Sequence, residues 1–93
     1  MFDWDEAKRQ ANLAKHGVDF ADADNFDWMN ADVGEDERFP YGEPRLVATG
    51  PIGTRLHVLI FTVRGGTRRI ISLRKANKRD KQRWLANRLR SLS

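Results

Sequence analysis

The 93-residue sequence predicts an α+β fold in which helices precede and follow an antiparallel β-meander. Two observations indicate this class. Helix-capping residues occur near both ends of the chain, and three runs with strand character lie between them, separated by glycine-containing turns. The length predicts a single domain over residues 1–93, and the absence of cysteine excludes a disulfide framework and thiolate metal sites.

The beginning of the sequence predicts a short edge strand followed by a helix. Residues 2–4 alternate apolar and polar side chains, and Asp5 is a typical N-cap for a helix over residues 6–16. Gly17 is expected to end this helix in the left-handed conformation. Small residues recur at helical spacing and predict a narrow buried stripe, which consists of Ala7, Ala11 and Ala14.

The next segment predicts a second short helix and then a loop. Asp19 is positioned to cap a helix that ends near residues 26–28. Residues 30–44 are rich in Asp, Glu, Gly and Pro, which indicates an exposed loop, with a short strand around residues 28–33.

Three strands of the meander are predicted over residues 45–50, 55–64 and 67–74. The intervening residues 51–54 and 65–66 have hairpin lengths, and the second pair is Gly-Gly, which tolerates the positive φ angles of a two-residue turn. The middle run is apolar on both alternations, so we expect it to be the central strand.

A basic amphipathic helix is predicted at the end of the chain. Asn77 is a candidate N-cap, with Asp80 at the third helical position. Lysine and arginine occupy most of the polar positions that follow. The apolar side chains form one stripe, which consists of Trp84, Leu85, Leu89 and Leu92.

The net charge of +4 conceals a strong division along the chain. Residues 1–45 carry five Lys/Arg against twelve Asp/Glu, a net charge of −7, whereas residues 46–93 carry twelve Lys/Arg against Asp80 alone, a net charge of +11. A basic block of this kind gains affinity for polyanions by releasing their counterions, so nucleic acid is the first partner to consider. A solvated basic face without a partner is the alternative.

The sequence contains no glycine-rich nucleotide-binding motif, and its two histidines, His16 and His57, match no metal-ligand spacing. We therefore expect no cofactor and no resident metal. The acidic beginning of the chain and its short apolar runs predict neither a signal peptide nor a membrane span. A cytoplasmic protein that does not associate with membranes is expected.

Arginine and lysine on the last two strands form the candidate site, because arginine binds phosphate bidentately and keeps its charge at any working pH. RNA carries its own nucleophile, the 2′-hydroxyl, so its cleavage requires only a base, an acid and cations that stabilise the transition state. His57 or His16 is the candidate proton carrier, and a purely structural role for either histidine is the alternative. The residues expected to line a phosphate cradle are Arg74, Lys75, one of the pair Arg68 and Arg69, and Arg64 or Arg55, with Lys78 and Arg79 beside them.

Three segments of the sequence resemble one protein family. The segments are Trp4-Asp5-x-x-Lys8-x-x-x-Asn12-x-x-Lys15-His16-Gly17-Val18-x-Phe20-x-x-Ala23-x-x-Phe26, then Glu43-x-Arg45 followed by Gly50, and finally Arg69-Ile70-Ile71-Ser72-x-Arg74-Lys75-Ala76. In this order, and over nearly the whole chain, they are similar to the BrnT family, the toxins of a bacterial type II toxin–antitoxin system. Leu73 departs from the family pattern, in which a small residue is usual, and Trp84 departs where tyrosine is common.

The resemblance implies a RelE-like fold and a ribonuclease activity that inhibits translation. It assigns Arg69, Arg74, Lys75 and His16 to the matching motifs. It also implies neutralisation by a BrnA-type antitoxin with a ribbon-helix-helix DNA-binding domain; we expect two copies of each protein in the complex, with operator DNA contacted only through the antitoxin. The favoured function is a metal-independent endoribonuclease that leaves 2′,3′-cyclic phosphate ends, and a module that binds RNA or DNA without cleavage is the alternative.

Overall fold

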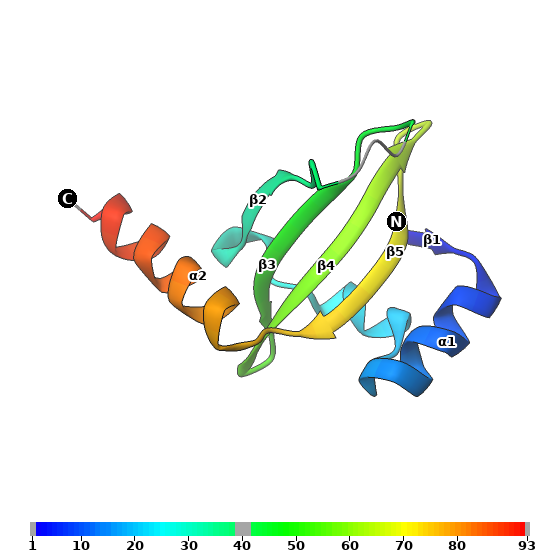
Figure 1. Cartoon of the computed structure of the whole chain (residues 1–93), viewed down its shortest axis with the longest axis horizontal. Helices are drawn as coiled ribbons and strands as arrows, with labels where there is room; N and C mark the ends of the chain where they lie inside the picture. The colour runs from blue at the N-terminus through cyan, green and yellow to red at the C-terminus, as the bar shows by residue number, and fades with distance from the viewer. Residues whose placement is uncertain (1, 39–41, 93) are drawn as a thin grey trace.

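The computed structural model describes residues 2–38 and 42–92, and it places α1 and α2 at the two sides of one sheet (Figure 1). The sheet has the strand order β1-β5-β4-β3-β2, in which β1 runs parallel to β5 and the other neighbouring strands are antiparallel. The elements in chain order are β1 (Phe2–Trp4), α1 (Glu6–His16), the 3₁₀ helices η1 (Phe20–Asn25) and η2 (Trp28–Asn30), β2 (Asp32–Glu35), β3 (Leu46–Ile52), β4 (Arg55–Arg64), β5 (Thr67–Lys75) and α2 (Lys78–Ser91).

The predicted α+β class and the β-meander with its central strand β4 are confirmed. The predicted edge strand at residues 2–4 is present as β1, and it pairs in parallel with β5. Together with β2 it gives a sheet of five strands in the described residues, more than the three to four strands expected for the meander. The second predicted helix is a 3₁₀ helix, which suits a connection of only six residues. Within the described residues, no helix is long and apolar enough to cross a membrane.

Helix α1 begins and ends as predicted, but it packs through a different face. The Asp5 side chain accepts a hydrogen bond from the Lys8 amide, and Gly17 adopts the left-handed conformation with φ 71°. The predicted buried stripe is wrong, because its members are all exposed: Ala7, Ala11 and Ala14. The buried residue of the helix is Asn12. Alanine offers little apolar area, so specific hydrogen bonds made by this amide decide how the helix is oriented.

Asn12 joins α1 to the sheet through hydrogen bonds to the main chain. Its Nδ2 donates to the carbonyl oxygens of Leu73 (2.7 Å) and Val18 (3.1 Å), and its Oδ1 accepts from the Leu73 amide (3.2 Å). Strand β1 pairs with β5 only from Arg68 to Ile70, so the main chain of Leu73 lies beyond the end of β1. Asn12 therefore satisfies the two polar groups of Leu73 that β1 does not reach.

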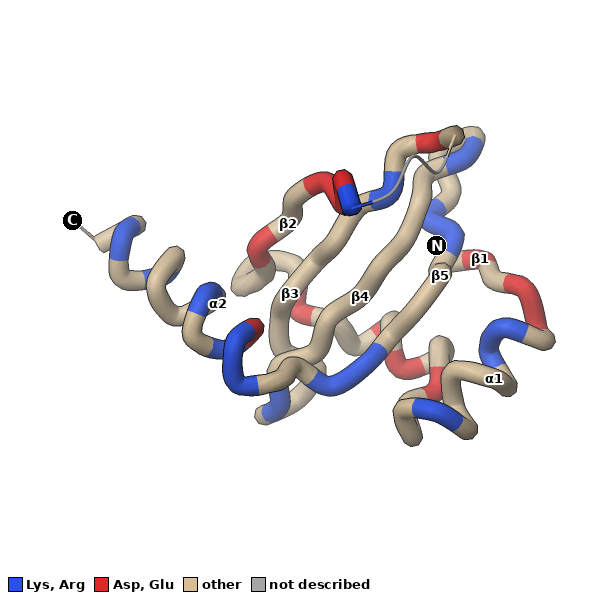
Figure 2. Tube along the Cα trace, viewed as in Figure 1, with Lys and Arg blue, Asp and Glu red and all other residues tan. Residues whose placement is uncertain are grey.

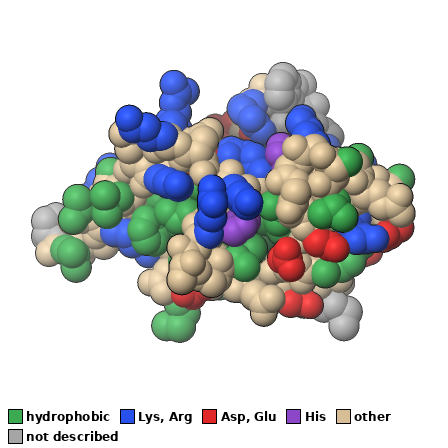
Figure 3. Space-filling model, turned by 90° about the horizontal axis from the view of Figure 1, so that it is seen from below, with side chains coloured by type: hydrophobic (Ala, Val, Ile, Leu, Met, Phe, Trp, Pro, Cys, Tyr) green, Lys and Arg blue, Asp and Glu red, His purple; other side chains and the backbone are tan. Residues whose placement is uncertain are grey.

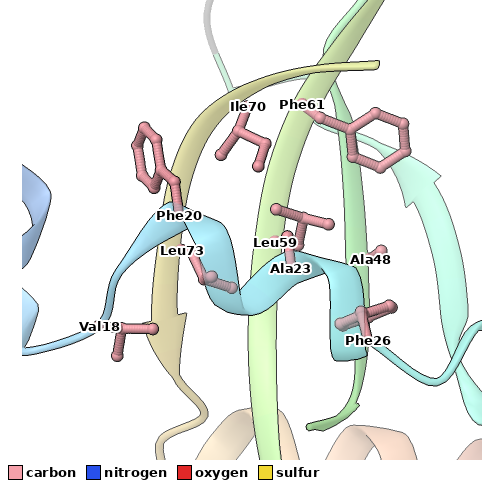
Figure 4. Close-up of a cluster of buried hydrophobic side chains, with 9 residues drawn as sticks. All are labelled: Val18, Phe20, Ala23, Phe26, Ala48, Leu59, Phe61, Ile70 and Leu73. Carbon is pink, nitrogen blue, oxygen red and sulfur yellow. The ribbon is translucent and has the colours of Figure 1, made fainter. Parts of the chain in front are cut away.

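The hydrophobic core lies on one face of the sheet, where η1 crosses the strands (Figure 4). The Asp19 side chain caps η1 by accepting a hydrogen bond from the Ala21 amide (3.0 Å). This helix then places two of its side chains against β3, β4 and β5. The buried cluster consists of Val18, Phe20, Ala23, Phe26, Ala48, Leu59, Phe61, Ile70 and Leu73.

The acid-rich segment that was expected to be a loop contains strand β2, which pairs with β3 along its whole length. The predicted loop over residues 30–44 is therefore wrong for residues 32–35, and the predicted strand around residues 28–33 lies later in the chain. The segment has low strand propensity, so its pairing with β3 determines its conformation. Residues 39–41 of the predicted loop lie outside the described residues.

A β-bulge changes which side chains of β5 share a face. Between Ile60 and Phe61 of β4, the register against β5 shifts by one residue, so that Ile71 is an extra residue in β5. Ile70 and Leu73 are consequently both buried in the core. Simple alternation of side chains predicts that Arg68, Ile70, Ser72 and Arg74 share one face of this strand, and this prediction is wrong across the bulge.

Helix α2 begins with the predicted capping box. The Asn77 side chain accepts a hydrogen bond from the Asp80 amide (2.8 Å), and the Asp80 side chain accepts one from the Asn77 amide (2.9 Å). No residue of the helix is buried. The predicted apolar stripe is present, but its leucines are exposed and contribute nothing to the core: Leu85, Leu89 and Leu92.

Polar contacts attach α2 to the segment that contains β2. The Trp84 indole Nε1 donates to the main-chain oxygen of Asn30 (2.8 Å), and the Asn87 side chain donates to Asp32 (2.9 Å). Arg88 forms an ion pair with the same Asp32 carboxylate and lies over the Trp84 ring. Figure 1 accordingly shows α2 on the β2 side of the sheet, away from α1.

Substitution of Asn12 by Ala is expected to lower the free energy of unfolding by about 3 kcal/mol, because three hydrogen bonds are lost and Leu73 retains buried polar groups without partners. Urea denaturation followed by circular dichroism measures the change. Gln10→Ala, a similar change on the exposed side of α1, is the matched control and should stay within about 0.5 kcal/mol of the parent. Equal stabilities of the two variants would show that Asn12 does not hold α1 on the sheet.

Candidate functional site

Four segments that are distant in the sequence meet at one end of the sheet. These segments are the end of β5, the beginning of β4, the end of α1 and the beginning of α2. Seen from below, the protein presents basic side chains around its two histidines (Figure 3). We call this region the basic end; its residues are His16, Arg55, His57, Arg74, Lys75, Lys78 and Arg79.

His57 is the buried histidine of the basic end and lies directly opposite Lys75 in the β4–β5 pair. Its Nδ1 is 2.8 Å from the main-chain oxygen of Arg55. A carbonyl oxygen only accepts hydrogen bonds, so Nδ1 carries the proton in this contact. The neutral ring then has its lone pair on Nε2, which is the form that can accept a proton.

His16 lies at the last position of α1 and is half-buried. Burial, followed by the positive charges of Lys15 and Arg74, lowers the pKa of His16 below its usual value. Asn12, one helical turn before His16, bonds to the main chain of Leu73, which directly precedes Arg74, so the end of α1 lies beside the end of β5. Because its pKa is lowered, His16 is neutral near pH 7 and is a second group that can accept a proton.

Arg74 is held in place by Asp80. Its Nη1 donates to an Asp80 carboxylate oxygen (2.7 Å) and to the main-chain oxygen of Lys75 (3.3 Å). Burial by itself would raise the pKa of Asp80, but the hydrogen bonds from Arg74 and from the Asn77 amide lower it below the usual value. The sequence predicted that Asp80 caps α2 but not that it binds Arg74. One feature of the sequence could have indicated this ion pair, because Asp80 is the single acid among residues 46–93.

The other predicted cradle residues of β4 and β5 lie elsewhere. Arg69 pairs with Asp3 (2.6 Å), and Arg64 pairs with Glu43 (2.7 Å). Basic residues therefore occupy both ends of β5 (Figure 2). Five residues of strand separate Arg69 from Arg74 by about 15 Å. The predicted cradle that combined Arg69 or Arg64 with Arg74 is therefore not formed.

Arg68 is also separated from Arg74, because the bulge in β5 turns the two side chains to opposite faces. The Arg68 guanidinium lies over the Trp28 ring, 4.3 Å from its centroid, and near the ring of Phe2. This contact is a cation–π interaction on the face that carries the core. Arg68 thus stabilises the aromatic rim of the core.

A groove of about 780 Å³ lies on the other face of the sheet, between β2 and α2. Val47, Val58 and Ile60 contribute to its lining from β3 and β4. Basic residues predominate toward α2 and acidic residues predominate in and after β2, with one exception on each side, Asp80 and Arg38. The predominant residues are Arg74, Arg79 and Arg83 toward α2, and Asp32, Glu35, Asp36 and Glu37 in and after β2. An open groove lined by Arg74 was expected on one face of the sheet, but its two sides, β2 and α2, could not be predicted, because only the tertiary structure brings them together.

Among residues 2–38 and 42–92, no group of three or more His, Cys, Asp or Glu side chains is arranged so that it could hold a metal ion. The basic end itself contributes lysine, arginine and histidine side chains. Those groups can bind a phosphate, stabilise negative charge on it and accept a proton from a hydroxyl.

Comparison with known proteins identifies the family. None of the curated proteins compared with the chain matches it. The family model described as "Ribonuclease toxin, BrnT, of type II toxin-antitoxin system" matches residues 4–80, a range that runs from β1 to the first turn of α2 and includes the whole basic end. The chain therefore belongs to the BrnT family of ribonuclease toxins of type II toxin–antitoxin systems.

Proposed function

We propose that the basic end is the active site of a metal-independent endoribonuclease that inhibits translation. The observation that carries this proposal is that His16, His57, Arg74 and Lys75 all lie at one end of the sheet, although they come from three separate elements. His57 and Lys75 are on the face of the sheet that carries the core, and Arg74 extends from the groove face at the same strand end. A binding surface alone would need only the cations. The two histidines add side chains that can take part in proton transfer.

The proposed reaction uses the 2′-hydroxyl of RNA as the nucleophile. The Nε2 atom of His57 takes the proton of this hydroxyl, because hydrogen bonding to the Arg55 carbonyl keeps the other ring nitrogen protonated. The 2′-oxygen then forms a bond to the adjacent phosphorus, and the bond from phosphorus to the 5′-oxygen breaks. The products are a 2′,3′-cyclic phosphate and a 5′-hydroxyl end.

Arg74 and Lys75 stabilise the negative charge that develops on the phosphate during this reaction. The bonds from Arg74 to Asp80 and to the Lys75 carbonyl both use Nη1, so a phosphate can bind to Nε and Nη2 without breaking them. Lys75 lies opposite His57 and can donate a proton to the leaving 5′-oxygen from its ammonium group. His16 is the alternative base, because its lowered pKa keeps it neutral.

The type II family implies an antitoxin partner for this toxin. We propose a BrnA-like antitoxin with a ribbon-helix-helix domain, two copies of each protein in the complex, a RelE-like fold for the toxin and a cytoplasmic location. The net charge of −7 on residues 1–45 supports a division of labour in which the antitoxin makes the operator contacts. The basic residues 46–93 are then left for RNA.

Arg74→Ala is expected to reduce RNA cleavage about 100- to 1000-fold and to abolish growth inhibition, because one preorganised cation is lost from the transition state. A fluorescent RNA assay and induced expression measure both effects, with circular dichroism as the check on folding. Arg69→Ala, at the other end of β5, is the matched comparison and should retain most of the activity. If Arg69→Ala lost more cleavage activity than Arg74→Ala, the active site would lie near Arg69, at the other end of β5, and the proposal would be contradicted.

Cleavage is expected to persist in excess EDTA and to leave 2′,3′-cyclic phosphate ends, because the nucleophile comes from the RNA itself. Mass spectrometry of the fragments identifies the ends. Loss of activity in EDTA and its return with zinc or manganese would contradict the proposed chemistry. Binding of RNA without any cleavage would instead favour a nucleic-acid-binding module.

His16 is expected to titrate below its usual pKa of about 6.5, and Lys15→Gln should raise this value because it removes a neighbouring positive charge. Histidine resonances followed by NMR between pH 4 and 8 measure the pKa, with Lys8→Gln on the same helix as the control. Since the folded pKa lies below the unfolded one, the unfolded chain binds the proton more tightly. Stability should therefore fall as the pH drops below about 6.5. A His16 pKa above that of the unfolded chain would refute this arrangement.

A further inference from the structure

Helix α2 exposes an apolar stripe on the side that faces away from the rest of the protein. Leu85, Leu89 and Leu92 are 53%, 59% and 83% exposed, and their i, i+4 and i+7 spacing places them on one face of the helix. We call these residues the leucine stripe. Other large apolar side chains that are exposed in the described part of the chain lie on separate elements: Leu13, Met29, Val33 and Val63.

The contacts that attach α2 to the protein use a different side of the helix. Asp80, Trp84, Asn87 and Arg88 make the bonds to β5, Asn30 and Asp32. At 100° per residue, these positions are turned away from the leucine stripe. An isolated helix of 14 residues is marginal in water, because most helical stability in proteins comes from burying an apolar face. α2 buries no residue, so its apolar face is left for a partner.

We propose that the leucine stripe docks an amphipathic helix of the antitoxin whose apolar face is flanked by Asp and Glu. This inference rests on the proposed function in taking the partner to be an acidic antitoxin, and it specifies where that protein is anchored. Charge complementarity selects this occupant. Helix α2 carries six Lys/Arg and one Asp, a net charge of +5, which attracts an acidic helix and repels a second copy of itself.

The position of the leucine stripe explains how an anchored antitoxin reaches the active site. Seven residues of helix, about 10 Å, separate Leu85 from Lys78, which is itself a residue of the basic end. An acidic helix that continues beyond the stripe toward the beginning of α2 brings carboxylates to Arg74 and Lys75. Anchoring and inhibition therefore use separate residues, and substitutions can separate the two.

The test replaces the three leucines together, as L85Q/L89Q/L92Q, which preserves helix propensity and removes the apolar side chains. The matched control replaces three exposed apolar side chains on other elements, as L13Q/M29Q/V63T. The probe is the purified full-length protein encoded by the reading frame next to the gene for this chain. Calorimetry measures its affinity for each full-length variant, circular dichroism verifies the folding, and the RNA assay measures cleavage.

The stripe variant is expected to lose about 100-fold in affinity for the probe while its RNA cleavage stays within about twofold of the parent, because the three leucines lie outside the basic end. The control variant should bind like the parent. The affinity of the parent, the stripe variant and the control variant for the probe should fall as the NaCl concentration is raised, since the contacts that flank the stripe are charged. Equal binding by the stripe variant and the parent, or no binding by the parent, would overturn the proposal.

Two further results would assign the leucine stripe to another occupant and also overturn the proposal. One is a parent chain that dimerises by itself in analytical ultracentrifugation and becomes monomeric in the stripe variant. The other is binding of the parent, lost in the stripe variant, to vesicles of phosphatidylglycerol. If the parent cleaves no RNA but the stripe variant still binds the probe more weakly than the parent does, the proposed ribonuclease site is contradicted and the proposed docking surface is supported.

Discussion

The pairing of the Asn12 side chain with the main chain of Leu73 sets the geometry on which the basic end depends. The amide of Asn12 bonds to both polar groups of Leu73 and thereby fixes α1 against β5. His16 is one helical turn after Asn12, and Arg74 directly follows Leu73. The same contact therefore orients the histidine at the end of α1 toward the cations at the end of β5, so that local stability and site geometry have one origin.

Packing of the core decides which basic side chains meet. The extra residue Ile71 in β5 lets both Ile70 and Leu73 enter the core. Without this bulge, the alternation of side chains would expose one of these two residues, and burying a large apolar side chain is worth about 1.5 to 3 kcal/mol. The consequence is electrostatic: Arg74 turns to the face with the groove, while Arg68 turns to the aromatic rim of the core.

Two carboxylates, those of Asp80 and Asp32, attach the basic helix α2 to the rest of the protein. Asp80 caps α2 and also holds Arg74, so the beginning of the last helix and the orientation of a candidate catalytic arginine are coupled. Asp32 holds the other part of α2 through Asn87 and Arg88. These carboxylates attach a highly basic helix to the protein without burying it, which leaves the leucine stripe available to a partner. The antitoxin partner that the type II family implies would meet an excess of lysine and arginine both on α2 and at the basic end.

The sequence by itself determined the elements whose signals are local. The caps at Asp5 and Asn77, the Gly-Gly turn and the apolar run of β4 each depend on neighbouring residues, and each occurs where it was predicted. The charge division and the family motifs also predicted a basic site that includes Arg74 and Lys75.

Only the tertiary structure decided how α1 packs, that residues 32–35 form β2, that Arg69 lies far from Arg74, and that the leucines of α2 stay exposed. Each of these depends on a partner distant in the sequence: Leu73 for Asn12, β3 for β2, and the core for the bulge in β5. Residue spacing along the chain carries no information about such pairings, because they are selected by burial and hydrogen bonding once the sheet has formed.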